Sequence, residues 1–119
     1  MEAVDYFGEK LKFEIDPPGI EELMKSGDKD YIIVDTRGRN AFREGHIPTA
    51  ISMPIEELRD KFAELPKDKK IILYCYNITC LRAPKAALFL ARNGYDNIVE
   101  LIGGFEEWSK RGHKVEPGQ

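Results

Sequence analysis

The sequence predicts an α/β fold built on a mainly parallel β-sheet. Two runs of apolar and aromatic residues, 31–34 and 71–74, lack polar alternation, which is typical of strands buried on both faces. Between these runs, residues 55–65 carry apolar side chains at helical spacing, at Ile55, Leu58, Phe62 and Leu65. Because strands and helices alternate along the chain, we expect right-handed parallel crossovers rather than hairpins.

Length and composition favour one globular domain and exclude several classes of partner. The chain has 119 residues, of which 42% are hydrophobic and 33% charged, enough for a single hydrophobic core. The net charge of −3 and the lack of a basic stripe predict no binding to nucleic acid, and no apolar run is long enough to cross a membrane. Two cysteines are too few for a disulfide scaffold, and the acidic N-terminus lacks the features of a signal peptide. We therefore expect a cytoplasmic protein.

The sequence of the first third of the chain predicts an arm, an edge strand, a helix and a buried strand. Residues 1–10 are interpreted as a loosely held arm, and residues 11–15 alternate apolar and charged side chains like a half-exposed edge strand. Asp16, followed by two prolines, is typical of the start of a helix, and Gly27 marks its end. The buried strand 31–34 follows.

The rest of the chain continues the alternation of helices and strands. Short strands are predicted at 51–53, 71–74 and 97–102, with a final edge strand at 113–115. Helical segments are predicted at 40–44, from Pro54 to Pro66, from Pro84 to Gly94 and at 105–108. The helix after Pro84 places five small or apolar residues on one face: Ala83, Ala86, Ala87, Leu90 and Ala91.

Cys75 stands where a buried strand passes through a short loop into a helix. Ligands of parallel α/β sheets bind outside the carboxyl ends of the strands, and Asp35-Thr36-Arg37 and Gly103-Gly104 also fall at strand ends. Unpaired N–H groups and the positive end of the helix dipole are expected to lower the pKa of the Cys75 thiol. The pattern thus predicts a nucleophile or an anion site. The alternative reading is a buried structural cysteine.

Four segments together carry a family resemblance. They are Val34-Asp35-Thr36-Arg37, Phe42-Arg43-Glu44-Gly45-His46-Ile47-Pro48-Thr49-Ala50, Tyr74-Cys75 and Gly103-Gly104-Phe105-Glu106-Glu107-Trp108. In this order they resemble the rhodanese (sulfurtransferase) domain over residues 11–116, which implies a single rhodanese-like domain after an arm of residues 1–10. The resemblance implies a central, mainly parallel five-stranded sheet flanked by helices on both faces.

The chain departs from the family pattern at two places. Thr49 stands where the family usually has glycine. The loop after Cys75 is longer than usual and holds a second cysteine, Cys80, so that the chain resembles a subgroup with Cys-x4-Cys spacing. The identity of the donor and the acceptor is therefore left open by the resemblance.

The resemblance implies a sulfurtransferase whose catalytic residue is Cys75. A small anionic donor such as thiosulfate would leave a sulfane sulfur on Cys75 as a persulfide, and a thiol, cyanide or a protein sulfur acceptor would remove it. No cofactor or metal is implied. The loop residues expected to bind substrate are Tyr76, Asn77, Ile78, Thr79, Cys80, Leu81 and Arg82, and Asp35, Arg37 and His46 are expected to support the site. Arg82 and Lys85 are candidates for attracting the anionic donor, or are simply solvated charges on the first turn of the helix.

Other functions remain open from the sequence. Cys80 is either a resolving cysteine that forms a disulfide with Cys75 or a small packing residue at the helix entry. The cysteine pair is also compatible with a redox-sensing or partner-binding module. A phosphatase or arsenate reductase requires Cys-x5-Arg, but here Leu81 occupies the arginine position and Arg82 follows one residue later. A zinc site would need Cys75, Cys80, His46 and His113 together, and the two histidines lie far apart in the sequence.

Overall fold

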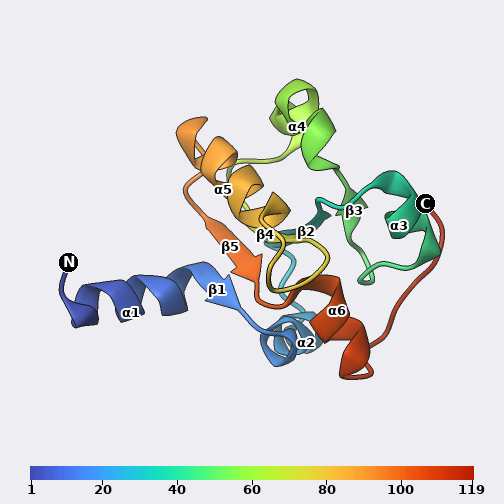
Figure 1. Ribbon diagram of the computed structural model, residues 1–119, viewed down its shortest axis with the longest axis horizontal. Coiled ribbons are helices and arrows are strands. Elements are labelled where there is room, and N and C mark those ends of the chain that lie inside the picture. Colours follow the sequence, from blue (N-terminus) through green and yellow to red (C-terminus); the bar gives the residue numbers. More distant parts are fainter.

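The chain folds around a five-stranded parallel sheet with the spatial order β1-β5-β4-β2-β3. The computed structural model describes all residues, 1–119. The strands are β1 (Glu14–Ile15), β2 (Tyr31–Asp35), β3 (Ile51–Ser52), β4 (Lys70–Tyr74) and β5 (Ile98–Leu101), and every neighbouring pair is parallel. The predicted α/β fold with a central parallel sheet is confirmed, and β4, which leads to Cys75, is its middle strand (Figure 1).

The helices begin and end at residues whose chemistry explains these limits. They are α1 (Ala3–Phe13), α2 (Pro17–Ser26), α3 (Arg39–Glu44), α4 (Ile55–Lys61), α5 (Arg82–Arg92) and α6 (Gly104–Lys110), and a 3-10 turn (Phe62–Glu64) extends α4. The predicted start and end of α2 are confirmed. The Asp16 carboxylate accepts the Gly19 N–H at 2.9 Å, and Gly27 closes the helix with φ 79°.

Helices cover both faces of the sheet, as the resemblance implied (Figure 1). On one face, Leu73 and its neighbours pack against α4 and α5 through Leu58 and Leu90. On the opposite face, Tyr74 belongs to a second core with side chains from α2, α3 and α6, among them Trp108. The two cores receive alternate residues of β4, because successive side chains of a strand point to opposite faces.

Two predictions about local structure are wrong. Residues 11–13 belong to α1 rather than to a strand, so that the arm is helical from Ala3 and only Glu14–Ile15 pair at the sheet edge. Residues 113–115 form no strand, because the segment makes only an isolated antiparallel bridge between Glu116 and His46. On the predicted apolar face of α5, Ala83, Ala86 and Leu90 are buried, whereas Ala91 is exposed.

Candidate active site

Cys75 is the first residue after β4, and the N-terminus of α6 holds its backbone in place. The Phe105 N–H donates to the Cys75 carbonyl at 2.8 Å, and the Glu106 N–H donates to the Tyr76 carbonyl at 2.9 Å. Gly104 has φ 62°, and a Cβ atom there would collide with the Cys75 carbonyl oxygen. Gly104, the first residue of α6, therefore allows this helix to approach the strand end closely.

The loop between Cys75 and α5 is held by hydrogen bonds to its backbone, and most of its side chains are exposed. Asn77 organises it, since its carbonyl accepts the Cys80 N–H at 3.2 Å and its side-chain oxygen accepts the Thr79 N–H at 3.2 Å. Ile78 and Leu81 are 72% and 59% exposed, so no core contact holds the tip of the loop. Cys75 itself lies beneath this loop and is only 2% exposed.

The two thiols are free, and their pKa values shift in opposite directions. Burial raises the pKa of Cys75 to about 11, and the hydrogen bond and charge of Cys80 add to the increase. Burial also acts to raise the pKa of Cys80, but the contact with Cys75 and the N–H groups of Arg82 and Tyr76 outweigh it, so that this pKa is lowered. The Cys75 thiol donates to the Cys80 carbonyl oxygen at 3.5 Å.

The sequence-based expectation of a lowered Cys75 pKa is therefore wrong for this conformation. The N–H groups of Ala83 and Tyr76 do lower the pKa, as expected at a helix N-terminus, but burial has the larger effect. The Arg82 guanidinium is also engaged elsewhere. It donates from Nε to the Thr36 carbonyl at 2.8 Å and from Nη1 and Nη2 to the Glu56 carboxylate at 2.9 and 2.8 Å.

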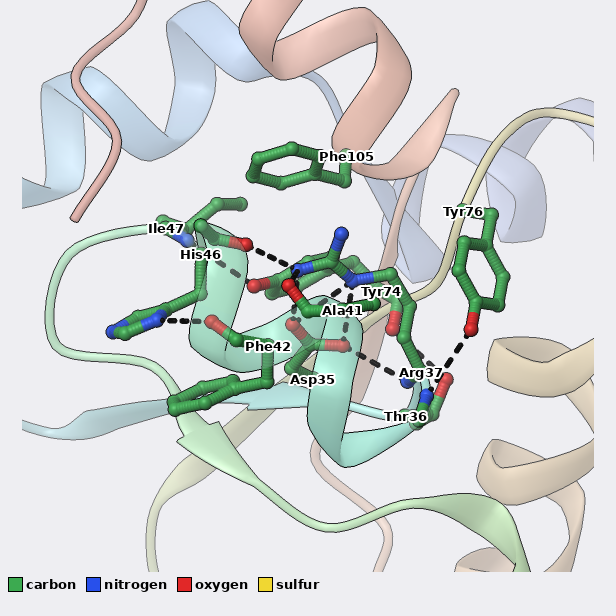
Figure 2. A network of polar contacts seen from close by, with 12 residues as sticks. Asp35, Thr36, Arg37, Ala41, Phe42, His46, Ile47, Tyr74, Tyr76 and Phe105 are labelled. Atoms are coloured by element: carbon green, nitrogen blue, oxygen red, sulfur yellow. Dashed lines mark hydrogen bonds and ion pairs between the residues drawn. The ribbon is translucent and has the colours of Figure 1, made fainter. Parts of the chain in front are cut away.

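A buried ion pair supports the end of β2 (Figure 2). Asp35 is fully buried and Arg37 is 4% exposed, and the Arg37 Nη2 donates to the Asp35 carboxylate at 2.8 Å and to the Gly45 carbonyl at 2.6 Å. The Phe105 ring lies over this guanidinium, with 4.1 Å between the Arg37 Cζ and the ring centroid. Burial acts to lower the pKa of Arg37, but the hydrogen bond and charge of Asp35 raise it on balance, so the guanidinium stays charged. The pair thus links β2, the turn after α3 and the first turn of α6.

His46 lies in the same polar network but its imidazole is directed toward α3 (Figure 2). The ring stacks on Phe42 with 3.7 Å between centroids, and its Nδ1 lies 2.9 Å from the Phe42 carbonyl oxygen. The backbone of His46 exchanges two hydrogen bonds with Glu116, at 2.8 and 2.9 Å. All of these contacts connect α3 to the C-terminal segment, and none reaches Cys75.

These features place the chain in a known family. The model of the family described as "Rhodanese-like domain" matches residues 19–111. The chain belongs to the rhodanese-like domain family. Cys75 and Cys80, with four residues between them, fit the Cys-x4-Cys loop predicted from the sequence.

Two proteins of similar sequence and one solved structure show how much of this chain its relatives share. The rhodanese-like chain is 40% identical to the HTH-type transcriptional regulator Rv0324 of Mycobacterium tuberculosis over 98 residues, 82% of this chain and 43% of the regulator. It is 31% identical to the thiosulfate sulfurtransferase GlpE of Coxiella burnetii over 87 residues, 73% of this chain and 78% of that enzyme. The crystal structure of the BH2092 protein from Bacillus halodurans has a TM-score of 0.89 at 40% identity and covers 97% of this chain and 84% of that one. The chain thus spans less than half the length of the Mycobacterium regulator.

The rhodanese-like domain does not assemble the zinc site considered from the sequence. No group of three or more His, Cys, Asp or Glu side chains has the arrangement to hold a metal ion. His113 stacks on Trp108 with 4.5 Å between ring centroids, and its Nδ1 lies 2.7 Å from a carboxylate oxygen of Glu21, in a part of the fold separate from Cys75. In addition, no helix combines the length and apolar character needed to cross a membrane.

Sequence reasoning assigned no role to three residues that position the site. Thr36 donates its hydroxyl to the Tyr74 carbonyl at 2.9 Å, which joins the ends of β2 and β4. The Tyr74 hydroxyl accepts the Ile47 N–H at 3.1 Å, and Glu56 fixes the Arg82 side chain. Glu56 gave no signal in the sequence, because it lies 26 residues before its partner and is one of several acidic residues in its helix.

Proposed function

We propose that this rhodanese-like domain is a sulfurtransferase and that Cys75 carries the sulfur as a persulfide. The position of Cys75 is the observation that supports this most strongly. Its sulfur lies at the carboxyl end of the central strand and faces the N–H groups of Ala83 and Tyr76, which stabilise negative charge. The similarity to an enzyme named thiosulfate sulfurtransferase favours the same reaction class here.

In the proposed reaction, the Cys75 thiolate attacks the sulfane sulfur of thiosulfate. A new S–S bond forms at Cys75, the S–S bond of thiosulfate breaks, and sulfite leaves with the electron pair. A thiophilic acceptor such as cyanide or a thiol then attacks the outer sulfur of the persulfide, and Cys75 leaves as the thiolate. No cofactor takes part. Because Cys75 is only 2% exposed, the donor reaches it when the loop 76–81 moves, and the absence of core contacts at Ile78 permits this movement.

Thiocyanate formation from thiosulfate and cyanide tests this proposal. Cys75→Ser should lower the rate by at least about 100-fold, since a serine hydroxyl is a far weaker nucleophile at neutral pH. Cys80→Ser serves as the matched control and should retain turnover. Equal rates for Cys75→Ser and the unmodified protein would contradict the assignment.

A second candidate function, redox sensing, rests on the contact between the two cysteines. The Cys75 thiol donates to the Cys80 backbone carbonyl, and the Cys80 side chain lies within hydrogen-bonding reach of Cys75. In this candidate, peroxide oxidises the Cys75 thiolate to a sulfenate, and Cys80 then condenses with it to a disulfide with release of water. A linked Cys75–Cys80 peptide after mild peroxide treatment supports this role. Sulfinate on Cys75 with Cys80 still reduced contradicts it.

The structure gives no support to the phosphatase alternative. Leu81, at the position where a phosphatase loop carries its arginine, is 59% exposed and has no charge. Arg82 is held by the Glu56 carboxylate and the Thr36 carbonyl. A guanidinium committed to these partners is not positioned to clamp a phosphoryl group above Cys75.

A further inference from the structure

No other element of the chain buries helix α1, which lies at the edge of the sheet. It extends outward from β1, the strand at one edge of the sheet (Figure 1). None of its 11 residues is buried, although its sequence is rich in large apolar side chains. A helix of this length is marginally stable in water on its own, and helices of globular proteins obtain most of their stability by packing an apolar face. The exposure of α1 therefore indicates a missing packing partner.

The apolar residues of α1 lie on two separate faces. Tyr6 and Phe13 line a groove of about 610 Å³ between α1 and α5, opposite Leu88. Val4, Phe7 and Leu11, spaced i, i+3 and i+7, take no part in lining this groove and are 78%, 57% and 81% exposed. We name these three residues, together with Gly8, the outer stripe.

We propose that the outer stripe packs against the outer stripe of a second copy of this chain, with the two α1 helices antiparallel around a twofold axis. The four positions of the stripe, 4, 7, 8 and 11, are separated by three, one and three residues, and this order is the same from either end of the helix. An antiparallel copy therefore presents a matching stripe, as a twofold interface requires. Gly8 lies inside it, and no heavy atom stands within 4 Å of a Cβ built there. The two helix backbones can therefore approach closely at this point.

The charges of α1 favour the antiparallel orientation and a second copy as the partner. The first half of the helix region carries Glu2 and Asp5. The second half carries Lys10 and Lys12, and also Glu9, which lines the groove and not the outer stripe. Lys10 pairs with Glu14, whereas neither Asp5 nor Lys12 forms an ion pair within the chain. Asp5 and Lys12 lie on one flank of the stripe, seven residues apart. Antiparallel pairing places Asp5 of one helix on the same side of the interface as Lys12 of the other, whereas parallel pairing would oppose like charges.

The size of the apolar surface indicates a weak, concentration-dependent dimer. An 11-residue helix is about 16 Å long. Such a helix alone covers less than the roughly 800 Å² per partner of a stable interface. The groove between α1 and α5 lies on the other face of the helix, so it adds no area to this contact. The proposed contact does not involve Cys75, so the test of the dimer is independent of the test of sulfur transfer.

Sedimentation of the purified protein over a wide range of concentrations tests the dimer. The mass should rise with concentration from 13.6 kDa toward twice this value. Val4→Glu/Leu11→Glu should remain monomeric throughout, and Lys110→Glu, an exposed charge change on α6, should behave like the unmodified protein. Because α1 contributes no buried residue, the double variant should keep its far-ultraviolet circular dichroism and unfolding midpoint apart from any helix fraying. A monomer at every concentration, or a dimer that survives in the double variant, would overturn the proposal.

A mixing experiment tests the antiparallel orientation and the identity of the partner. Asp5→Lys makes the flank of the stripe uniformly positive, and Lys12→Asp makes it uniformly negative. Each variant alone should dimerise about tenfold more weakly than the unmodified protein, because like charges then face each other. An equimolar mixture of the two should recover the dimer. Failure of the mixture to associate more tightly than either variant alone would rule out this pairing.

Discussion

Replacing Cys80 by serine should make Cys75 a better nucleophile at neutral pH. The pKa of Cys75 is raised to about 11, first by burial and then by the hydrogen bond and charge of Cys80. At pH 8 this leaves roughly one Cys75 in a thousand as the thiolate. Serine stays neutral at all accessible pH values, so Cys80→Ser removes the charge contribution while the burial contribution remains. We therefore expect the pKa of Cys75 to fall below 11 but to stay above the ordinary value of a thiol.

The size of the rate effect follows from two opposing trends. Each unit by which the pKa falls increases the thiolate fraction about tenfold, while the lower basicity reduces the nucleophilicity of each thiolate by about threefold. The net gain at pH 8 is about threefold for each pKa unit. In both proteins the rate should increase with pH through the neutral range, because the reactive form is the thiolate and the pKa lies well above neutral.

Alkylation of Cys75 by iodoacetamide as a function of pH measures this effect. Peptide mass spectrometry separates Cys75 from Cys80 in the unmodified protein, and in Cys80→Ser only Cys75 reacts. Ile78→Ser is the matched control, because it introduces the same residue at an exposed position of the same loop without removing a thiol. An unchanged or higher Cys75 pKa in Cys80→Ser would refute the reasoning.

Three further predictions concern the support of the site and its specificity. Asp35→Asn should lower the free energy of unfolding by about 3 kcal/mol or more in urea titrations, because it leaves the buried Arg37 charge unpaired. The control Glu107→Gln removes an exposed ion pair on α6 and should lower it by less than about 1 kcal/mol. Equal losses of unfolding free energy in the two variants would contradict this account. Thr49 has φ 72°, a strained backbone conformation that glycine adopts without strain. Thr49→Gly should therefore raise the free energy of unfolding by about 1 kcal/mol. An equal gain in Thr49→Ala would show that backbone strain is not the cause. Aryl phosphates should not be hydrolysed, because Leu81 offers no charge to the phosphoryl group. Hydrolysis by the unmodified protein that is lost in Cys75→Ser would contradict this.

The core of the fold could be predicted because its patterns are local and strong. The apolar runs that became β2 and β4, and the caps of α2 at Asp16 and Gly27, act within a few residues of one another. The N-terminal helix was missed because residues 11–15 also satisfy the two-residue period of a strand. The helical stripe Val4, Phe7 and Leu11 was present in the same segment, but no single pattern decides between two compatible periods.

The parts of the site that could not be predicted depend on distant contacts. The strand-end position of Cys75 follows from the order of elements, so the sequence was sufficient to locate it. The direction of its pKa shift depends on how deeply the loop covers the sulfur, which only tertiary packing determines. In the same way, the role of Arg82 depends on Glu56, which belongs to another helix.

The most direct test of the account is the intact mass of the protein after incubation with thiosulfate. The unmodified protein should gain the mass of one sulfur atom, and cyanide should remove it with release of thiocyanate. Cys80→Ser should gain the same mass, and Cys75→Ser should gain none. A sulfur adduct that persists in Cys75→Ser, or no adduct on the unmodified protein, would contradict the claim that Cys75 carries the transferred sulfur.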